Sequence, residues 1–97
     1  MLYNVTAFAP LPEGRLFVKL DTGESGLFDM RPYMKSDFFA QLKNDAYFRR
    51  ACIEYGVISW PNGQDISPAT VRMEMENRDC PDGMELRYET SLNTPEK

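Results

Sequence analysis

The chain has 97 residues, 42% of them hydrophobic and 27% charged, with a formal net charge of −4 and an isoelectric point near 4.7. A chain of this length forms one domain and has no room for two. The negative charge argues against nucleic acid as a direct ligand, because phosphate binding needs a basic face. The acidity lies mainly in residues 68–97, which hold four basic and seven acidic side chains.

Cysteine content and hydropathy bear on where the protein works. Cys52 and Cys80 are the only cysteines, and two cysteines do not make a disulfide framework. The first six residues lack the basic and apolar segments of a signal peptide, and no apolar stretch reaches transmembrane length. We therefore expect a cytoplasmic protein with reduced thiols that does not enter a membrane.

Three strands with short connections are predicted in the first third of the chain. β-Branched and aromatic residues and two-residue alternation predict strands over residues 2–8, 15–20 and 25–30. Pro10 and Pro12 are expected to end the first strand, because proline cannot donate to a sheet ladder. A glycine-containing turn over residues 21–24 joins the second and third strands. The connections are short, so the three strands should form an antiparallel meander.

The middle of the chain predicts short helices and a hairpin. Ser36 is typical of a helix N-cap. Phe38, Phe39 and Leu42 follow at spacings of three and four, which would place them on one face of a helix packed against the sheet. Further predicted elements are a short helix from Asn44-Asp45 and strands over residues 51–55 and 57–60 that turn at Tyr55-Gly56.

Residues 60–68, Trp-Pro-Asn-Gly-Gln-Asp-Ile-Ser-Pro, predict a strand end, a tight turn and a helix start. Pro61 should end the strand that runs into Trp60. Ser67 is a favourable N-cap, and the proline after it suits the first helical position. A helix is therefore expected over residues 68–77. Trp60 is the only tryptophan, and we expect it to be a large core anchor.

The chain divides in our interpretation into an α+β core domain, residues 1–77, and an acidic C-terminal extension, residues 78–97. In the extension, Met84, Leu86 and Tyr88 alternate with charged residues. This alternation indicates an edge strand, and the alternative is a frayed tail.

Several chemistries are excluded by what the sequence lacks. The sequence has no histidine, so it lacks the commonest metal ligand. For the same reason it cannot form a Ser-His-Asp or Cys-His catalytic arrangement. The sequence has no phosphate-binding glycine loop and no close cysteine pair for zinc. Asp21, Asp29 and Asp65 could serve acid–base chemistry or hold a divalent cation, but aspartate is also ordinary at turns and caps. We therefore predict no catalytic, cofactor-binding or metal-binding residue.

Trp60, Asn62 and Asp65 are the candidate residues for an interaction surface or ligand groove. The alternative for Trp60 is core packing with a satisfied indole N–H, and this alternative is favoured. Cys52 lies in a predicted strand, where a buried and inert thiol is expected. Neighbouring Arg49 and Arg50 keep a reactive thiol open as an alternative.

Two segments resemble one known family. Residues 16–30, Leu-Phe-Val-Lys-Leu-Asp-Thr-Gly-Glu-Ser-Gly-Leu-Phe-Asp-Met, and residues 58–68, Ile-Ser-Trp-Pro-Asn-Gly-Gln-Asp-Ile-Ser-Pro, resemble the bacterial domain of unknown function 2442 family. The resemblance covers about residues 1–75. It implies an α+β domain with a small antiparallel sheet, found alone or ahead of a helix-turn-helix domain. Stand-alone members neighbour small toxin-like proteins, which implies an antitoxin-like role, and no catalytic residue is established.

The sequence therefore predicts an α+β fold, with a small antiparallel meander sheet and two to three short helices packed on it. Its predicted function is a non-enzymatic interaction protein, antitoxin-like or regulatory, that binds a small basic protein or forms a homodimer. The first alternative is a small-molecule-sensing domain. A carboxylate- or metal-dependent enzyme is a weaker alternative. No cofactor, direct nucleic-acid binding or membrane association is expected.

Overall fold

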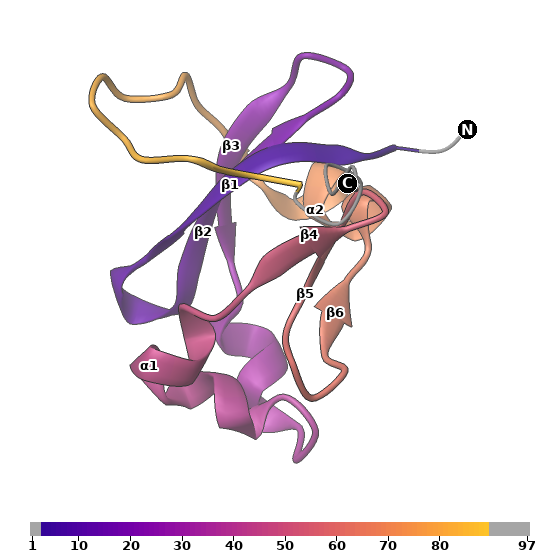
Figure 1. Cartoon of the computed structure of the whole chain (residues 1–97), viewed down its shortest axis with the longest axis vertical. Coiled ribbons are helices and arrows are strands. Elements are labelled where there is room, and N and C mark those ends of the chain that lie inside the picture. Colours follow the sequence, from indigo (N-terminus) through magenta and orange to yellow (C-terminus); the bar gives the residue numbers. More distant parts are fainter. Residues whose placement is uncertain (1–2, 90–97) are drawn as a thin grey trace, which may run out of the picture.

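Two antiparallel sheets organise residues 3–89, the part of the chain that the computed structural model describes (Figure 1). The larger sheet has the order β7-β3-β2-β1-β8 and consists of β1 (Val5–Leu11), β2 (Arg15–Leu20), β3 (Ser25–Asp29), β7 (Glu76–Asn77) and β8 (Arg87–Tyr88). The smaller has the order β4-β5-β6 and consists of β4 (Cys52–Glu54), β5 (Val57–Ser59) and β6 (Asp65–Ile66). The predicted antiparallel meander is confirmed as β1-β2-β3.

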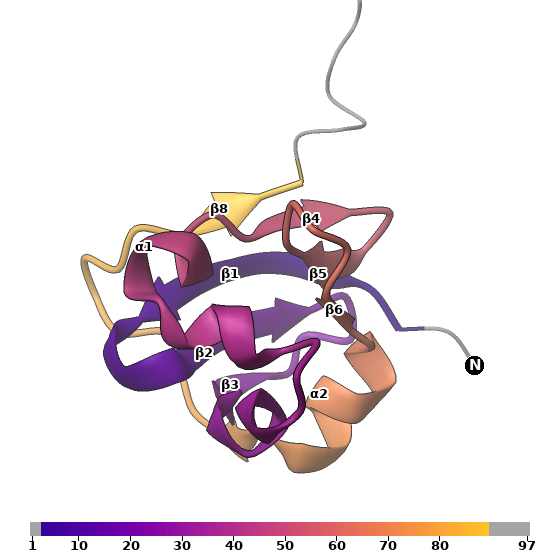
Figure 2. The same ribbon diagram turned by 90° about the horizontal axis from the view of Figure 1, so that it is seen from below.

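Two short α-helices and three 3-10 turns complete the fold. The helices are α1 (Asp45–Phe48) and α2 (Pro68–Glu74). The turns are η1 (Pro12–Gly14), η2 (Arg31–Lys35) and η3 (Ala40–Lys43). Figure 1 shows α1 and the turns at one end of the molecule, and Figure 2 views the molecule from that end. The predicted α+β class is therefore confirmed.

The first strand departs from its predicted limits. It starts at Val5 and continues through Pro10 to Leu11, although we expected Pro10 to end it; position 2 lies outside the described residues. β8 pairs with β1 only at Ala7 and Phe8, so the outer edge of β1 is unpaired beyond Phe8. A proline is tolerated at such an edge because no ladder hydrogen bond needs its missing N–H.

The prediction of a helix that starts at Ser36 is wrong. Ser36 instead ends η2 in an extended conformation, although its hydroxyl accepts a hydrogen bond from the Phe39 N–H at 3.3 Å. The chain then forms η3, in which Leu42 is buried. Phe38 does not join the buried side: 55% of its surface is exposed. Of the three residues in the predicted apolar stripe, η3 contains only Leu42, and Phe38 and Phe39 precede it, so the stripe does not form one buried helical face.

The short helix predicted from Asn44-Asp45 and the hairpin turn predicted at Tyr55-Gly56 are confirmed. Asn44 caps α1 by accepting a hydrogen bond from the Tyr47 N–H at 3.1 Å. The β4–β5 hairpin turns at Tyr55 and Gly56, which have φ values of 54° and 79°. Both residues with positive φ fit the tight hairpin turn that matches the strand twist.

The Trp60 stretch has its predicted turn and helix start, with two differences. A further strand, β6, which was not predicted, lies between the turn and the helix and pairs with β5. β5 stops at Ser59, and Ser67 caps α2 by accepting a hydrogen bond from the Ala69 N–H at 3.1 Å. However, α2 ends at Glu74 and does not reach Asn77. The following residues extend and pair with β3 as β7, so sheet pairing replaces the last helical turn.

The core fills the space between one face of the larger sheet and the other elements. On β2, Leu16, Val18 and Leu20 point into this core, as their alternation predicts. Phe17 points to the opposite face and is still only 1% exposed. The larger sheet is therefore covered on both faces. Many antiparallel sheets instead have one face packed on the core and the other exposed to solvent.

Residues 78–86, here called the arm, supply cover for the second face. The arm leaves β7 beside β3 and reaches β8 beside β1, so it passes from one edge of the sheet to the other. Figure 2 shows it on the opposite side of the strands from α2. Met84 and Leu86 line a hollow together with Ala9, which is the cross-strand partner of Phe17. The edge strand expected in the extension is present as β8, and residues 90–97 lie outside the described residues.

Candidate functional site

Trp60 belongs to the core. Its side chain is 3% exposed, and its ring lies 5.7 Å from the ring of Phe48, centroid to centroid. The indole N–H donates to the backbone carbonyl of Phe48 at 2.8 Å. The favoured interpretation of Trp60, core packing with a satisfied N–H, is confirmed. The indole face is therefore occupied by protein.

A buried polar network connects the hairpin tip after Trp60 to the loop before α1. Gln64 is the buried polar residue at its centre. The Tyr47 hydroxyl donates to Gln64 Oε1 at 2.6 Å and accepts a hydrogen bond from the Asn62 N–H at 2.8 Å. Gln64 Nε2 donates to the Phe38 carbonyl at 3.0 Å and to Gln41 Oε1 at 3.3 Å. A network whose members are satisfied holds its segments in one arrangement.

The network presents a small exposed surface, here called the tip surface, made of Phe38, Gln41, Pro61 and Asn62. The Asn62 amide donates to Gln41 Oε1 at 2.7 Å, which fixes both side chains. The Phe38 ring packs edge-on against Phe39, with centroids 5.3 Å apart, and is otherwise exposed. The tip surface is thus an aromatic side chain beside two oriented amides.

The three predicted site residues have different positions. Trp60 is buried below the tip surface, Asn62 is part of it, and Asp65 is exposed in β6 just beyond Gln64. A binding role for Asn62 and Asp65 stays a prediction. Sequence reasoning missed Gln41, Tyr47 and Gln64. Glutamine and tyrosine carry no local signal that they will meet across 17 to 23 positions, so only the fold brings them together.

The candidate carboxylates occur in separate surroundings. Asp21 accepts a hydrogen bond from the Asn4 amide at 3.1 Å, and Asp65 lies in the other sheet. Asp29 accepts hydrogen bonds from Arg31 at 2.8 to 3.2 Å, and these bonds hold the pKa of Asp29 below its usual value. Among residues 3–89, no three acidic or cysteine side chains gather where they could hold a metal ion.

The cysteines differ from a reactive pair. Cys52 is half-buried in β4, and burial, followed by the nearby charge of Glu54, raises the pKa of its thiol. A raised pKa disfavours the thiolate that would react. Cys80 lies in the arm, and both thiols are free. In the part of the chain that the structure covers, no helix has the length and apolar character to cross a bilayer.

Comparison with known proteins places the chain in a family. No curated protein and no solved structure matches it. The match to a family covers residues 5–76, from the start of β1 to the start of β7, and so includes the meander, the hairpin tip and α2. The arm and β8 follow the matched region. The chain therefore belongs to the family described as protein of unknown function DUF2442.

Proposed function

We propose that the protein is a non-enzymatic interaction protein whose tip surface binds a small basic protein partner. The observation that carries this proposal is Phe38, an exposed aromatic side chain held in place by its surroundings. Gln64 fixes its carbonyl and Phe39 supports its ring. Aromatic side chains are enriched at the energetic centres of interfaces, and a side chain that is already ordered loses less entropy on binding.

The distribution of charge supports a basic partner. Asp37 precedes Phe38 in the chain, and Asp65 follows the hairpin tip. Within residues 3–89, neither carboxylate forms an ion pair, and the same holds for the arm carboxylates Asp79, Asp82 and Glu85. Unpaired acidic side chains attract a basic protein over a distance and speed its association.

An antitoxin-like or regulatory role in the cytoplasm is the biological form that we propose for this binding. Its support is the acidic balance and the family resemblance, together with a sequence without histidine, which lacks the Ser-His and Cys-His nucleophile–base pairs. The partner would be a small basic protein encoded beside this one. Its binding to this chain would be the whole activity, without a chemical step.

The test measures binding of the basic product of the neighbouring gene by calorimetry. Phe38→Ala should weaken binding more than about tenfold, as removal of an aromatic hot spot does. Tyr55→Ala is the matched control, because Tyr55 is 76% exposed on the other hairpin tip and should leave affinity unchanged. Both variants should keep the wild-type circular dichroism spectrum. Equal effects of the two changes would exclude the tip surface as the binding site.

Salt dependence tests the electrostatic part separately. If unpaired carboxylates guide the partner, raising the salt from about 0.05 to 0.5 M should slow association more than it speeds dissociation. Asp37→Asn should reduce this salt dependence, whereas neutralising Asp29, which already pairs with Arg31, should change it less.

A second candidate function, small-molecule sensing, is favoured by one specific observation. A cavity of about 450 Å³ opens beside η3 and α1. This volume is in the range of small-molecule sites.

A further inference from the structure

Two backbone groups inside the polar network fix the orientation of the Gln64 amide. The Phe38 carbonyl can only accept a hydrogen bond, so the Gln64 atom that lies 3.0 Å from it is the amide nitrogen, Nε2. The Asn62 N–H can only donate, so the Tyr47 hydroxyl that accepts it directs its own hydrogen to Gln64 Oε1. Both constraints give the buried Gln64 amide the same orientation.

The orientation of Gln64 determines the orientations of the two amides on the tip surface. Gln64 Nε2 donates to Gln41 at 3.3 Å, so the Gln41 atom on this side is Oε1. The same Oε1 accepts a second hydrogen bond, from Asn62 Nδ2 at 2.7 Å. Gln41 Oε1 and Asn62 Nδ2 are therefore both engaged within the network. The other ends of these amides are Gln41 Nε2 and Asn62 Oδ1.

These two other ends are available to a partner, and they differ in kind. In the described part of the chain, neither Gln41 Nε2 nor Asn62 Oδ1 forms a hydrogen bond, and both residues are exposed. The Gln41 nitrogen can only donate, and the Asn62 oxygen can only accept. Because one hydrogen bond joins the two amides, the tip surface presents an oriented donor and an oriented acceptor on neighbouring side chains.

This combination selects between chemical groups. A carboxylate only accepts, so it would meet the Asn62 oxygen unfavourably, and an ammonium or guanidinium group only donates, so it would meet the Gln41 N–H groups unfavourably. A peptide main chain carries both a carbonyl and an N–H. In an extended segment the two groups of one residue point to the same side, as in the hydrogen-bonded pairs of an antiparallel ladder. An extended main chain therefore satisfies both amides.

We infer that Gln41 and Asn62 bind the main chain of an extended segment of the basic partner. Gln41 Nε2 donates to a carbonyl of this segment, and Asn62 Oδ1 accepts a hydrogen bond from the N–H of the same residue. A neighbouring side chain of the segment packs on Phe38. This binding mode rests on the proposed function, because it specifies which part of the partner the tip surface recognises. The network orients both amides before the partner arrives, which lowers the entropy lost on binding.

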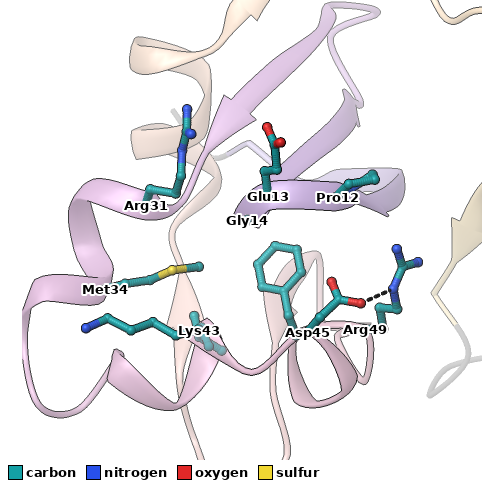
Figure 3. A pocket seen from close by; sticks show the side chains of 10 residues that line it. Pro12, Glu13, Gly14, Arg31, Met34, Lys43, Asp45 and Arg49 are labelled. Carbon is teal, nitrogen blue, oxygen red and sulfur yellow. Dashed lines mark hydrogen bonds and ion pairs between the residues drawn. The ribbon is translucent and has the colours of Figure 1, made fainter.

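The cavity beside η3 and α1 is a separate place on the molecule. Figure 3 shows the side chains that line it, and none of them belongs to the tip surface. Within η3, Leu42 and Lys43 line the cavity, whereas Gln41 bonds to Asn62. A small molecule in the cavity would therefore not use Gln41 or Asn62, and the two kinds of binding can be measured apart.

Gln41→Glu separates main-chain recognition from attraction by charge alone. The new carboxylate can still accept hydrogen bonds from Gln64 and Asn62, but it cannot donate to a partner carbonyl. Calorimetry with the basic product of the neighbouring gene should show binding weakened about fivefold or more, as expected for the loss of one hydrogen bond between neutral groups. If charge alone attracted the partner, the added negative charge would tighten binding instead.

Asn77→Asp is the matched control. It adds the same charge at an exposed amide residue of β7, which belongs to the larger sheet and not to the hairpin that carries Asn62. This variant should bind the partner as wild type does or slightly more tightly. Both variants should keep the wild-type circular dichroism spectrum. Equal affinities of Gln41→Glu and Asn77→Asp would overturn the inference, even where Phe38→Ala still weakens binding and so supports the proposed function.

A second measurement probes the partner. Overlapping synthetic peptides of its sequence locate the segment that binds, and N-methylation of one peptide bond at a time then removes single main-chain N–H groups. Methylation at one position should weaken binding about fivefold, since it removes the donor to Asn62. A segment that tolerates methylation at every position, or a partner none of whose peptides binds, would overturn recognition of an extended main chain. A partner that does not bind the wild-type protein at all would overturn the proposed function as well.

Discussion

At the residue scale, Gln64 shows how one buried polar side chain organises a surface. Its amide bonds to the Tyr47 hydroxyl, to the Phe38 carbonyl and to Gln41. A buried amide without these partners would cost about 1–3 kcal/mol. The same bonds that avoid this cost hold the Phe38 loop against the hairpin tip. The position of the exposed aromatic ring is thus set by a residue that a partner would not touch.

Trp60 gives the first stability prediction. Trp60→Ala should lower the free energy of unfolding by about 3–5 kcal/mol, because it removes a buried ring and leaves a cavity beside Phe48. Urea melts followed by circular dichroism measure the change. Tyr55→Ala, at an exposed tyrosine, should cost well under 1 kcal/mol. A loss below about 1 kcal/mol for Trp60→Ala would contradict its role as a core anchor.

At the element scale, β8 adds contacts between the two sheets to the one that β1 already makes, in which the Val5 N–H donates to the Gly56 carbonyl at 2.8 Å. β8 pairs with β1 at Ala7 and Phe8. The Arg87 guanidinium donates to the carbonyls of Arg49 and Ala51, the segment that leads into β4. Glu89 accepts a hydrogen bond from the Gly56 N–H at the next hairpin. β8 and the residue after it therefore connect the two sheets.

Truncation after Asn77 tests this element. It removes the arm and β8, so it leaves the β1 edge at Ala7 and Phe8 unpaired and the carbonyls of Arg49 and Ala51 without their bonds to Arg87. The truncated chain should stay folded but lose about 2 kcal/mol, which lowers Tm by roughly 8–16 °C for a domain of this size. Arg87→Ala in the full chain should reproduce part of the loss. A truncated protein without native circular dichroism would show that residues 1–77 do not fold alone.

At the scale of the whole molecule, electrostatics acts mainly on the surface. Within residues 3–89 the structure contains four ion pairs, and all are substantially exposed: Arg31–Asp29, Arg49–Asp45, Arg72–Glu24 and Arg78–Glu76. Exposed pairs contribute little stability. Stability therefore depends on the apolar core, and the charges are available to set solubility and the choice of partner.

One hydrogen bond between η2 and α2 predicts how the stability of the protein changes at alkaline pH. The Tyr33 hydroxyl donates to Glu74 at 2.6 Å, and this bond, with some burial, raises the pKa of Tyr33 to about 12 from an ordinary 10.0. A pKa raised by folding gives stability that is complete below pH 10 and lost as the pH approaches 12. The effect should be small, because Tyr33 is partly exposed.

Urea melts of wild type and Tyr33→Phe between pH 8 and 11.5 measure this dependence. Wild type should be the more stable protein at pH 8, and its advantage should shrink above pH 10. The difference in phenolate absorbance between the two proteins reports the titration of Tyr33 itself. If that difference titrated near pH 10, the Glu74 bond would not persist in solution.

The local sequence by itself determined many of the strands, helix caps and turns of this protein. Two-residue alternation in β2, the caps at Asn44 and Ser67, and the turns at Gly23 and Gly56 act through neighbours in the chain, so the sequence shows them directly. The buried position of Trp60 followed from its size and its place at a strand end.

Tertiary structure decided the rest, because the interactions that matter there join distant positions. Pro10 stays in β1 because β8, almost 80 residues later, leaves that edge unpaired. The helix predicted from Ser36 gives way to 3-10 turns, and Gln64 holds the backbone between them. The tip surface depends on such long-range contacts. Periodicity and composition describe only neighbours in the sequence and not contacts between distant residues. Only the folded chain therefore shows which side chains meet.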